Sequence, residues 1–403
     1  MPKTVAIVGA GPAGLMAAEK LSAAGLQVTI YEGMHTAARK FLMAGRGGLN
    51  LTHSEPFELF VTRYREAQVM LAPLITEFSP LDLRAWCEAL GQETYVGTSG
   101  RVFPRAMKAS PLLRAWLIRL QQQGVTINYG QRWIGWRDDA LLFRDQAGVE
   151  TSINADAILL ALGGASWPRL GADGSWQKIL AARGVDIVPL RPANCGFVIP
   201  WSPIFREKYA GQPLKTIILT SQGQDFQGES IITKQGMEGG VVYAASALLR
   251  EQIEKQGKAQ ITIDLKPDLS VEQLRQRLQK ARGRDSLSNH LRKVAGLSPM
   301  AVGLVQEILH QKRGLDPVLM IKALPLVLTA TAGLERAISS AGGVPFSEIN
   351  SSFMLKRIPG VFVAGEMLDW EAPTGGYLLQ ATFSTAVRAA SGIQVFLNAG
   401  SRT

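Results

Sequence analysis

The sequence predicts an α/β protein that is built on a parallel sheet and interrupted by a second domain. An apolar strand, a glycine-rich turn and a helix open the chain at Lys3, and a strand of the same kind returns at Val361. From about residue 191 to residue 330 the pattern changes, because strand-like segments alternate with turns and two helices follow them. We therefore expect a discontinuous first domain of residues 1–190 and 335–403, and an inserted domain of residues 191–334 that is rich in strands and also helical.

The opening segment has the pattern of a dinucleotide-binding, Rossmann-like unit. A buried strand leads into a turn with Gly9, Gly11 and Gly14, then into a helix and a second strand that ends in Glu32. Gly9 allows the tight turn, Gly11 lets a pyrophosphate approach the backbone, and Gly14 lets the helix lie close to the strand. The helix start suits a dianionic group. Glu32, 18 residues after Gly14, suits the hydroxyls of an adenosine ribose, which favours FAD or NAD over NADP.

The next elements of the first domain carry their own signals. Ser79 and Asp82 form a capping box at the start of a helix, and the apolar spacing places Cys87 in the core. A helix over 111–123 and strands over 125–129 and 157–162 follow, the last strand ending at Gly163 and Gly164.

The inserted domain is expected to begin with short strands and to continue with two helices. The strand-like segments are 216–220, 230–233 and 260–264. The first helix begins at Ser270, where Gln273 completes a capping box, and it turns four leucines toward a core: Leu274, Leu278, Leu287 and Leu291. The second helix begins at Ser298 and Pro299.

The closing segment points to FAD rather than NAD. A buried strand at Val361 is followed by Gly365 and Glu366, then by Asp369 and by a helix that starts near Gly375. Asp369 would bind the ribityl or pyrophosphate region. The helix start would direct its positive end at the N1–C2 edge of the flavin, which favours the anionic reduced form by about 1 kcal/mol for each dipole contact.

Composition is typical of a globular enzyme in a reducing cytoplasm. Of the 403 residues, 46% are hydrophobic and 19% charged, and no stretch is long and apolar enough to span a membrane. Cys87 and Cys195 are the only cysteines, which argues against a disulfide framework, and the spacing of the four histidines predicts no metal site. The net charge of +10 would attract a polyanionic partner. A basic surface that binds no partner explains the same charge equally well.

Motifs over nearly the whole length make the chain resemble the bacterial HI0933-like or BaiN-like NAD(P)/FAD-dependent oxidoreductases, aminoacetone-oxidase-like flavoproteins of the GR2 type with an inserted domain. The motifs lie at residues 9–14, 39–52, 100–104, 163–174, 341–344, 365–369 and 375–380. The resemblance implies noncovalent FAD held by Gly9, Gly11, Gly14, Glu32, Arg39, Lys40, Arg46, Asn50, Gly163, Gly365, Glu366, Asp369 and Gln380. Their neighbours in the same turns are also candidate cofactor contacts: Pro12, Ala13, Gly45, Gly164, Gly375 and Gly376.

Two departures mark a divergent branch. The family usually has Gly-Arg-Cys-Asn before its conserved threonine, whereas this chain has no cysteine there, so thiol chemistry is excluded at that position. In the insertion, a family motif Thr-His-x-Gly-x-Ser-Gly-Pro is changed, with Lys234, Glu238 and Gly240 in place of His, Ser and Pro.

The resemblance implies hydride transfer from a transiently bound NAD(P)H to an unsaturated substrate, such as a base in structured RNA. Basic residues on the Ser270 helix and its continuation favour RNA, although a solvated helix face explains them equally: Arg275, Arg277, Lys280, Arg282, Arg284, Arg292 and Lys293. Tyr377, His53, Lys234 and Glu238 are the candidates for the proton donor. The alternatives are an oxygen-using oxidase or hydroxylase, and a non-enzymatic RNA-binding protein with structural FAD.

Overall fold

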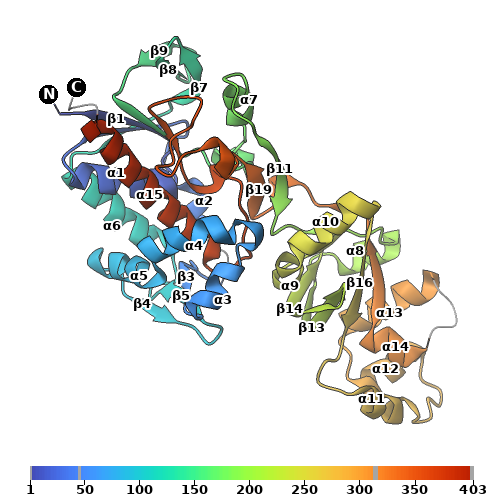
Figure 1. The fold of residues 1–403 in the computed structure, drawn as a ribbon. Helices are drawn as coiled ribbons and strands as arrows, with labels where there is room; N and C mark the ends of the chain where they lie inside the picture. The colour runs from blue at the N-terminus through green and yellow to red at the C-terminus, as the bar shows by residue number, and fades with distance from the viewer. Residues whose placement is uncertain (1, 44–46, 312–315, 400–403) are drawn as a thin grey trace. The chain divides into compact units, whose positions relative to one another are not determined.

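The structure is a computed structural model, and it describes residues 2–43, 47–311 and 316–399. The chain divides into two compact units (Figure 1). The first comprises Met1–Arg191 and Ser339–Thr403, and the second comprises Pro192–Ile338. Each unit has a hydrophobic core of its own. The chain therefore enters the second unit once and returns once.

A five-stranded parallel sheet is the centre of the first unit as far as it is described. Its order is β20, β10, β1, β2 and β6. The strands are β1 (Thr4–Val8), β2 (Gln27–Glu32), β6 (Thr126–Tyr129), β10 (Ala157–Leu160) and β20 (Val361–Val363). Strands β1, β10 and β20 are buried almost throughout, as expected of a sheet that is covered on both faces. The predicted Rossmann-like α/β fold class is thus confirmed.

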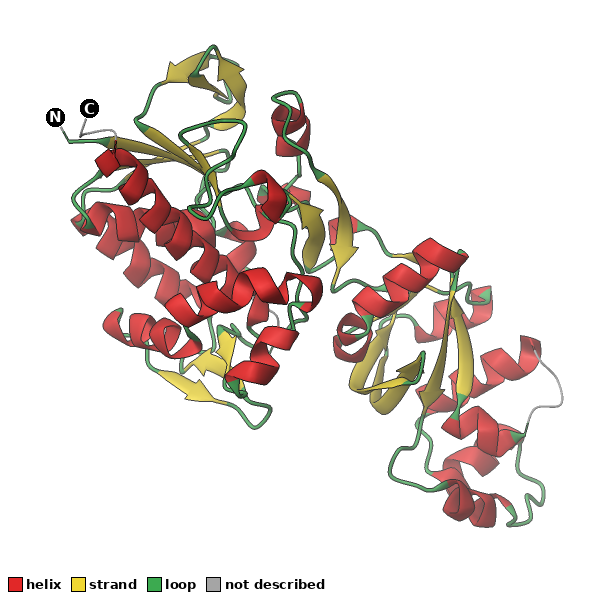
Figure 2. Ribbon diagram, viewed as in Figure 1, coloured by secondary structure: helices red, strands yellow, loops and turns green. Residues whose placement is uncertain are grey.

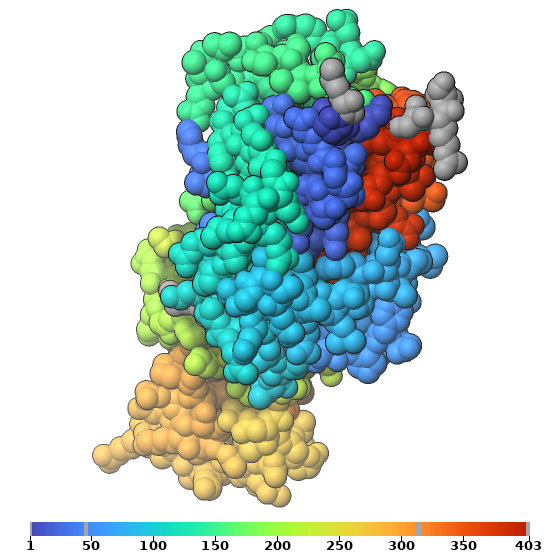
Figure 3. All heavy atoms as spheres, turned by 90° about the vertical axis from the view of Figure 1, so that its left-hand side faces the viewer, coloured from blue at the N-terminus to red at the C-terminus, as the bar shows by residue number. Residues whose placement is uncertain are grey.

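Helices α1 (Pro12–Ala23) and α15 (Tyr377–Ala399) pack against each other over this sheet. Figure 3 shows the described N-terminal segment, in blue, and the C-terminal helix, in red, side by side on one face of the unit. Helix α6 (Ala109–Gln122) packs beside α1. Helix α5 (Pro80–Ala89) begins with the expected capping box of Ser79 and Asp82, and it buries Cys87 completely. The C-terminal segment is therefore part of the same helical layer as α1.

Smaller elements of the first unit were not predicted. They include two three-stranded antiparallel sheets, β3-β5-β4 and β7-β8-β9. Their strands are β3 (Thr52–His53), β4 (Thr94–Val96), β5 (Arg101–Pro104), β7 (Arg132–Arg137), β8 (Ala140–Arg144) and β9 (Glu150–Ile153). Shorter helices are α2 (Arg39–Leu42), α3 (Phe57–Thr62), η1 (Arg65–Ala67), α4 (Gln68–Glu77), η2 (Pro168–Leu170), α7 (Trp176–Ala181), η4 (Phe346–Glu348) and η5 (Gly365–Met367). Strands β11 (Val188–Ala193) and β19 (Ser339–Gly343) pair with each other.

The described part of the second unit contains an antiparallel sheet of seven strands with helices packed around it (Figure 2). In sheet order the strands are β17 (Leu324–Leu328), β16 (Ala259–Asp264), β13 (Pro213–Ser221), β14 (Gln224–Ile232), β15 (Gly236–Glu238), β12 (Phe197–Val198) and β18 (Ala330–Thr331). The helices are α8 (Pro203–Tyr209), α9 (Gly240–Ala244), α10 (Ser246–Gln256), α11 (Val271–Leu278), α12 (Leu287–Ala295), α13 (Pro299–Gln311), α14 (Pro317–Lys322) and η3 (Leu334–Arg336).

The helix expected to continue from Ser270 to Leu291 is broken. Its capping box is present, but α11 ends at Leu278 and α12 starts anew behind a second cap at Ser286. The connecting segment contains Gly283 at φ +57°, a left-handed conformation that interrupts a helix. The leucine spacing fitted one long helix, but it is satisfied by two helices that contact each other.

Across the described ranges, no helix combines the length and the apolar composition that crossing a bilayer requires.

Candidate functional site

The glycine turn after β1 leaves open space at one position and is tightly packed at two others. A Cβ on Gly9, whose φ is +105°, would lie 2.5 Å from the Ala161 carbonyl oxygen. A Cβ on Gly14 would lie 2.0 Å from the carbonyl oxygen of Gly9. A Cβ on Gly11 would meet no atom within 4 Å. Gly9 and Gly14 are therefore required for packing, whereas Gly11 borders space that a ligand can use.

This open space lies at the N-terminus of α1. Gly11 is the N-cap residue, and Pro12 and Ala13 form the first turn. Gly365 comes close to the same turn, because a Cβ on Gly365 would lie 2.8 Å from the Cβ of Ala13. The free N–H groups and the dipole of the helix favour an anion at this point.

Glu32 lies at the end of β2 and is held by backbone groups. The N–H of Ala10 donates to its Oε2 at 2.7 Å, and the N–H of Met34 donates to its Oε1 at 2.8 Å. Burial raises the pKa of the Glu32 carboxyl, although these two bonds and the charge of Arg39 oppose the rise. Glu32 and Arg39 are thus brought together beside the glycine turn, as a binding role requires.

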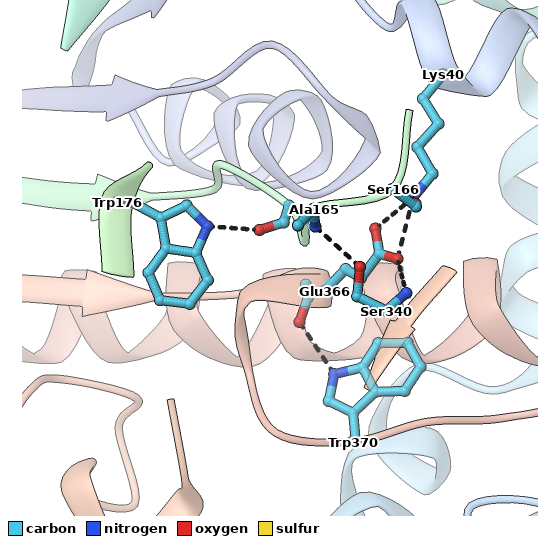
Figure 4. Close-up of polar contacts among 9 residues, drawn as sticks. Lys40, Ala165, Ser166, Trp176, Ser340, Glu366 and Trp370 are labelled. Atoms are coloured by element: carbon cyan, nitrogen blue, oxygen red, sulfur yellow. Dashed lines mark hydrogen bonds and ion pairs between the residues drawn. The ribbon is translucent and has the colours of Figure 1, made fainter. Parts of the chain in front are cut away.

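Lys40 and Glu366, which are 326 positions apart in the sequence, form an ion pair. The Lys40 Nζ lies 2.7 Å from Oε2 of Glu366 and 3.0 Å from its Oε1. It also donates to the Ser166 hydroxyl at 2.5 Å. The N–H of Ser340 donates to Oε1 of Glu366 at 3.0 Å (Figure 4). Four segments of the first unit therefore meet at one carboxylate.

The glycine pair after β10 lies against this carboxylate. A Cβ on Gly164 would lie 2.5 Å from the Ser340 hydroxyl and 3.3 Å from the carboxyl carbon of Glu366. Gly163 has a φ of +69°, and its carbonyl accepts a hydrogen bond from the Trp176 indole at 2.9 Å (Figure 4). The missing side chain of Gly164 therefore makes room for Ser340 and Glu366.

The start of α15 is fixed against β3. Gly376 has a φ of +100°, and a Cβ there would lie 2.4 Å from the backbone of Thr52. The neighbouring Gly375 has a φ of +134°. The Thr52 hydroxyl donates to Oε1 of Gln380 at 2.8 Å, and Nε2 of Gln380 donates to the Phe78 carbonyl at 2.6 Å. Gln380 is fully buried, so its side chain ties α15 to its neighbours, which differs from the direct FAD contact implied by the resemblance.

Asp369 lies against the strand β19 and the residue that follows it. Burial raises the pKa of its carboxyl, while Arg191 and the N–H of Gly342 act against that rise. Its own N–H donates to the Val344 carbonyl at 2.9 Å.

Asn50 has a buried side-chain oxygen that accepts no hydrogen bond from any described residue. A buried acceptor without a donor is costly, so its position suits a ligand that can donate. Gly45 and Arg46, which were also expected to hold FAD, lie outside the described residues.

Two of the four proton-donor candidates, Tyr377 and His53, lie in one network. Their rings stack with centroids 5.5 Å apart. The Tyr377 hydroxyl donates to Oε1 of Glu55 at 2.6 Å, and Arg63 donates to both carboxylate oxygens of Glu55. Nδ1 of His53 accepts from the Glu55 N–H at 3.1 Å, and its Nε2 is bonded to the Ser99 carbonyl at 2.9 Å. Both side chains are therefore committed to partners inside the protein.

The pKa values of Tyr377 and Glu55 are shifted in opposite directions. Burial, then the Glu55 contact, raises the pKa of Tyr377 well above its usual value. Burial also raises the pKa of Glu55, but hydrogen bonds from Arg63 and Tyr377 outweigh burial and leave that pKa below its usual value. Tyr377 thus remains a neutral donor and Glu55 remains an anion at neutral pH.

The other two candidates belong to the second unit. Lys234 is exposed in the turn between β14 and β15. Oε2 of Glu238 lies 3.8 Å from the Arg336 guanidinium, and its charge acts on the pKa of Tyr243. Burial, followed by the charge of Glu238, raises the pKa of Tyr243 to about 12.

The sequence pattern of a known protein family extends over almost the whole chain. This family, described as HI0933-like protein Rossmann domain, matches residues 3–392. The chain belongs to the HI0933-like family.

Two curated relatives match the HI0933-like chain over nearly its whole length. The 3-dehydro-bile acid delta(4,6)-reductase of Clostridium scindens is 24% identical, over 94% of this chain and 96% of the relative. The ribosomal RNA dihydrouridine synthase of Escherichia coli is 25% identical, over 94% of this chain and 95% of the relative. Among solved structures, the open conformation of a flavocytochrome c3 fumarate reductase shares the fold, with a TM-score of 0.54 at 17% identity, covering 98% of this chain and 78% of that one. The structural match shows that the fold is shared, and the family model shows that the chain is an HI0933-like Rossmann protein.

The residues present in this HI0933-like chain fit FAD. Gly11 borders open space at a helix N-terminus, Glu32 is fixed at the strand end where a ribose would bind, and Asn50 carries an acceptor that lacks a donor among the described residues. The sequence had not indicated Ser340, Glu55 or Arg63 as part of the region, and Ser166 was named only as a position within the motif of residues 163–174. Glu55 and Arg63 are eight positions apart in the sequence. Nothing in the sequence around them indicates that they pair.

Proposed function

We propose that this HI0933-like protein is an FAD-dependent reductase that takes hydride from NAD(P)H and delivers it to a conjugated carbon–carbon double bond. The single observation that carries the proposal is the nucleotide cradle: open space at Gly11, at the start of α1, with the Glu32 carboxylate beside it. When bound, FAD supplies an isoalloxazine that accepts and returns a hydride. The two free, buried cysteines suit a reducing cytoplasm as the place of the reaction.

The chain's own residues would bind and orient this cofactor. The N–H groups at the start of α1 would hold the phosphates, and Glu32 would accept hydrogen bonds from the ribose. The start of α15, which is fixed at Gly376 by Thr52, would present N–H groups and a positive dipole to the flavin edge where negative charge develops. The Asn50 side-chain oxygen would accept a hydrogen bond from the cofactor.

The names of the two curated relatives support the reaction class. A delta(4,6)-reductase and a dihydrouridine synthase both add hydrogen across a carbon–carbon double bond. For this chain we propose a base in structured RNA as the substrate. The relative from E. coli is named for that kind of substrate, and the second unit carries a suitable surface.

This basic surface consists of seven exposed side chains on α11, α12 and the segment between them: Arg275, Arg277, Lys280, Arg282, Arg284, Arg292 and Lys293. Lys293 pairs with Asp285 at 2.8 Å and Arg275 lies 3.8 Å from Asp316, and these two ion pairs neutralise only a part of the positive charge. A hollow of about 470 Å³ is lined by Asn289, Arg292, Lys293, Gly296, Leu297 and Pro299. Such a surface can contact successive phosphates.

The reductase proposal is tested on the purified protein. We expect a yellow protein whose flavin absorbance is bleached by NADH or NADPH without oxygen and returns when substrate is added. A protein that binds FAD but is reduced by neither nicotinamide would contradict the proposal. Rapid reoxidation by oxygen with one peroxide or one oxygenated product for each flavin would favour the oxidase or hydroxylase alternative.

The RNA proposal is tested by filter binding at several salt concentrations. Replacing Arg282 and Arg284 by alanine should weaken RNA binding. It should also make the plot of log binding constant against log salt concentration less steep, by about 0.9 for each phosphate that the protein no longer neutralises. Replacing the exposed Arg105, in the first unit, should change neither value. RNA binding without any nicotinamide-driven turnover would favour a non-enzymatic RNA-binding protein with structural FAD. Absence of RNA binding at low salt would exclude RNA as the partner.

A further inference from the structure

The Lys40 ammonium is bonded to three oxygen atoms of the protein. It donates to both oxygens of Glu366 and to the Ser166 hydroxyl, and Glu366 receives a further N–H from Ser340. The side chains of Lys40 and Glu366 are 28% and 17% exposed, so the pair is largely shielded from water. A short, shielded and multiply bonded ion pair fixes both side chains in one geometry.

Glu366 occupies an unfavourable place for a carboxylate if the cofactor is a dinucleotide. Its neighbour Gly365 contacts the first turn of α1 at Ala13, which is where a diphosphate would bind. Glu32 adds a second carboxylate at the same glycine turn. An unpaired Glu366 would therefore repel the ligand, and in a low dielectric this repulsion is strong.

We propose that Lys40 is a positioning residue for cofactor binding. Its ammonium neutralises the Glu366 carboxylate and orients it, so that Glu366 remains a hydrogen-bond acceptor next to a diphosphate-bearing ligand. This inference rests on the proposed FAD-dependent function and gives Lys40 a role different from the direct cofactor contact implied by the family resemblance. Gly163 and Gly164 belong to the same arrangement, because a side chain on Gly164 would overlap with Ser340 and displace the carboxylate.

The test is a double-mutant cycle on the full chain, with FAD affinity measured by the quenching of flavin fluorescence as apoprotein is added. The four proteins are wild type, Lys40→Met, Glu366→Gln and the double variant. Lys40→Met should weaken FAD binding about tenfold or more, because it leaves an unpaired carboxylate in the site. In the Glu366→Gln background the same replacement should cost less than about threefold, because no carboxylate remains to be neutralised.

Lys3→Met is the matched control, since it removes an exposed ion pair with Asp156 from the same unit. It should leave FAD affinity unchanged, and thermal melting should show that all variants are folded. Equal losses of affinity in both backgrounds would mean that Lys40 acts on the ligand itself, and would overturn the inference. An unchanged affinity in Lys40→Met would overturn it as well. A folded wild-type protein that takes up no FAD would instead refute the proposed function, and this inference with it.

Discussion

The hydroxyl of Tyr377 donates a 2.6 Å hydrogen bond to Glu55, a residue 322 positions earlier in the chain. The same tyrosine is held at its backbone, because the Tyr64 hydroxyl donates to the Tyr377 carbonyl at 2.8 Å. Tyr377 is the first residue of α15 and follows directly after Gly375 and Gly376. These bonds therefore fix the start of the helix that we expect to face the flavin.

Replacing Tyr377 by phenylalanine should lower the stability of the apoprotein. The change removes a half-buried hydrogen bond to an ionised acceptor, and such a bond is worth about 1.5–3 kcal/mol. Urea denaturation followed by circular dichroism measures the loss. Tyr129→Phe, at an exposed tyrosine of β6, is the control and should have little effect. Equal stability of Tyr377→Phe and wild type would show that the Glu55 contact contributes nothing.

The same variant separates a structural tyrosine from a catalytic acid. Because the Tyr377 proton is already donated to Glu55, we expect the substrate-dependent reoxidation of the reduced flavin to fall only slightly in Tyr377→Phe. Stopped-flow absorbance measures this rate. A loss of about 10²–10⁴-fold, the range for removing a general acid, would instead identify Tyr377 as the proton donor.

Two alanine substitutions in the glycine turn should affect different properties, one FAD binding and the other stability. Gly11→Ala should leave the stability of the apoprotein near that of wild type, because its Cβ meets only open space, but it should weaken FAD binding. Gly14→Ala should destabilise the fold itself, because its Cβ would lie 2.0 Å from the Gly9 oxygen. Thermal melting and FAD titration of both variants check the contrast. Normal FAD affinity in Gly11→Ala would place the phosphates elsewhere.

The contribution of Glu55 to the unfolding free energy should decrease as the pH is lowered. Its pKa in the folded protein is below the usual 4.5, because the bonds from Arg63 and Tyr377 outweigh burial. Its stabilising effect is therefore fully present above pH 4.5 and is lost as the pH falls through the lower folded value. The difference in unfolding free energy between wild type and Glu55→Gln should shrink as the pH is lowered from about 7 to about 3.5. Glu93→Gln, at an exposed pair with Arg105, should show little such trend.

Both cysteines should be unreactive in the native protein. Burial, with a smaller effect of Glu88, raises the pKa of Cys87 to about 12, and Cys87 and Cys195 are both fully buried. A thiol reagent such as 5,5′-dithiobis(2-nitrobenzoate) should label neither residue until denaturant is added. Labelling of native protein would mean that α5 or the segment between β11 and β12 opens readily.

Local signals in the sequence predicted the elements that depend on near neighbours. The strand that ends in Glu32 and the capping boxes at Ser79 and Ser270 are present in the structure, because each is decided within a few residues. The same reasoning failed between Leu278 and Leu287. There the apolar spacing fitted a continuous helix, but the structure has two helices, and Gly283 between them is in a left-handed conformation.

The contacts within the site were harder to predict because they join distant parts of the chain. Lys40 and Glu366 were both expected to hold FAD, but nothing in their local sequence indicated that they pair with each other. Gln380 shows the same limit. Its motif suggested a ligand contact, whereas its amide is occupied by Thr52 and Phe78, which lie far earlier in the chain.

The pairing of β11 with β19 brings together the two points at which the chain passes between its units. The chain leaves the first unit through one of these strands and returns through the other, so the two cut points lie on neighbouring backbones. A short hairpin loop in place of residues 192–338 would then join them without disturbing the parallel sheet, giving a minimal nucleotide-binding module. We therefore predict that the first unit can be produced and studied without residues 192–338.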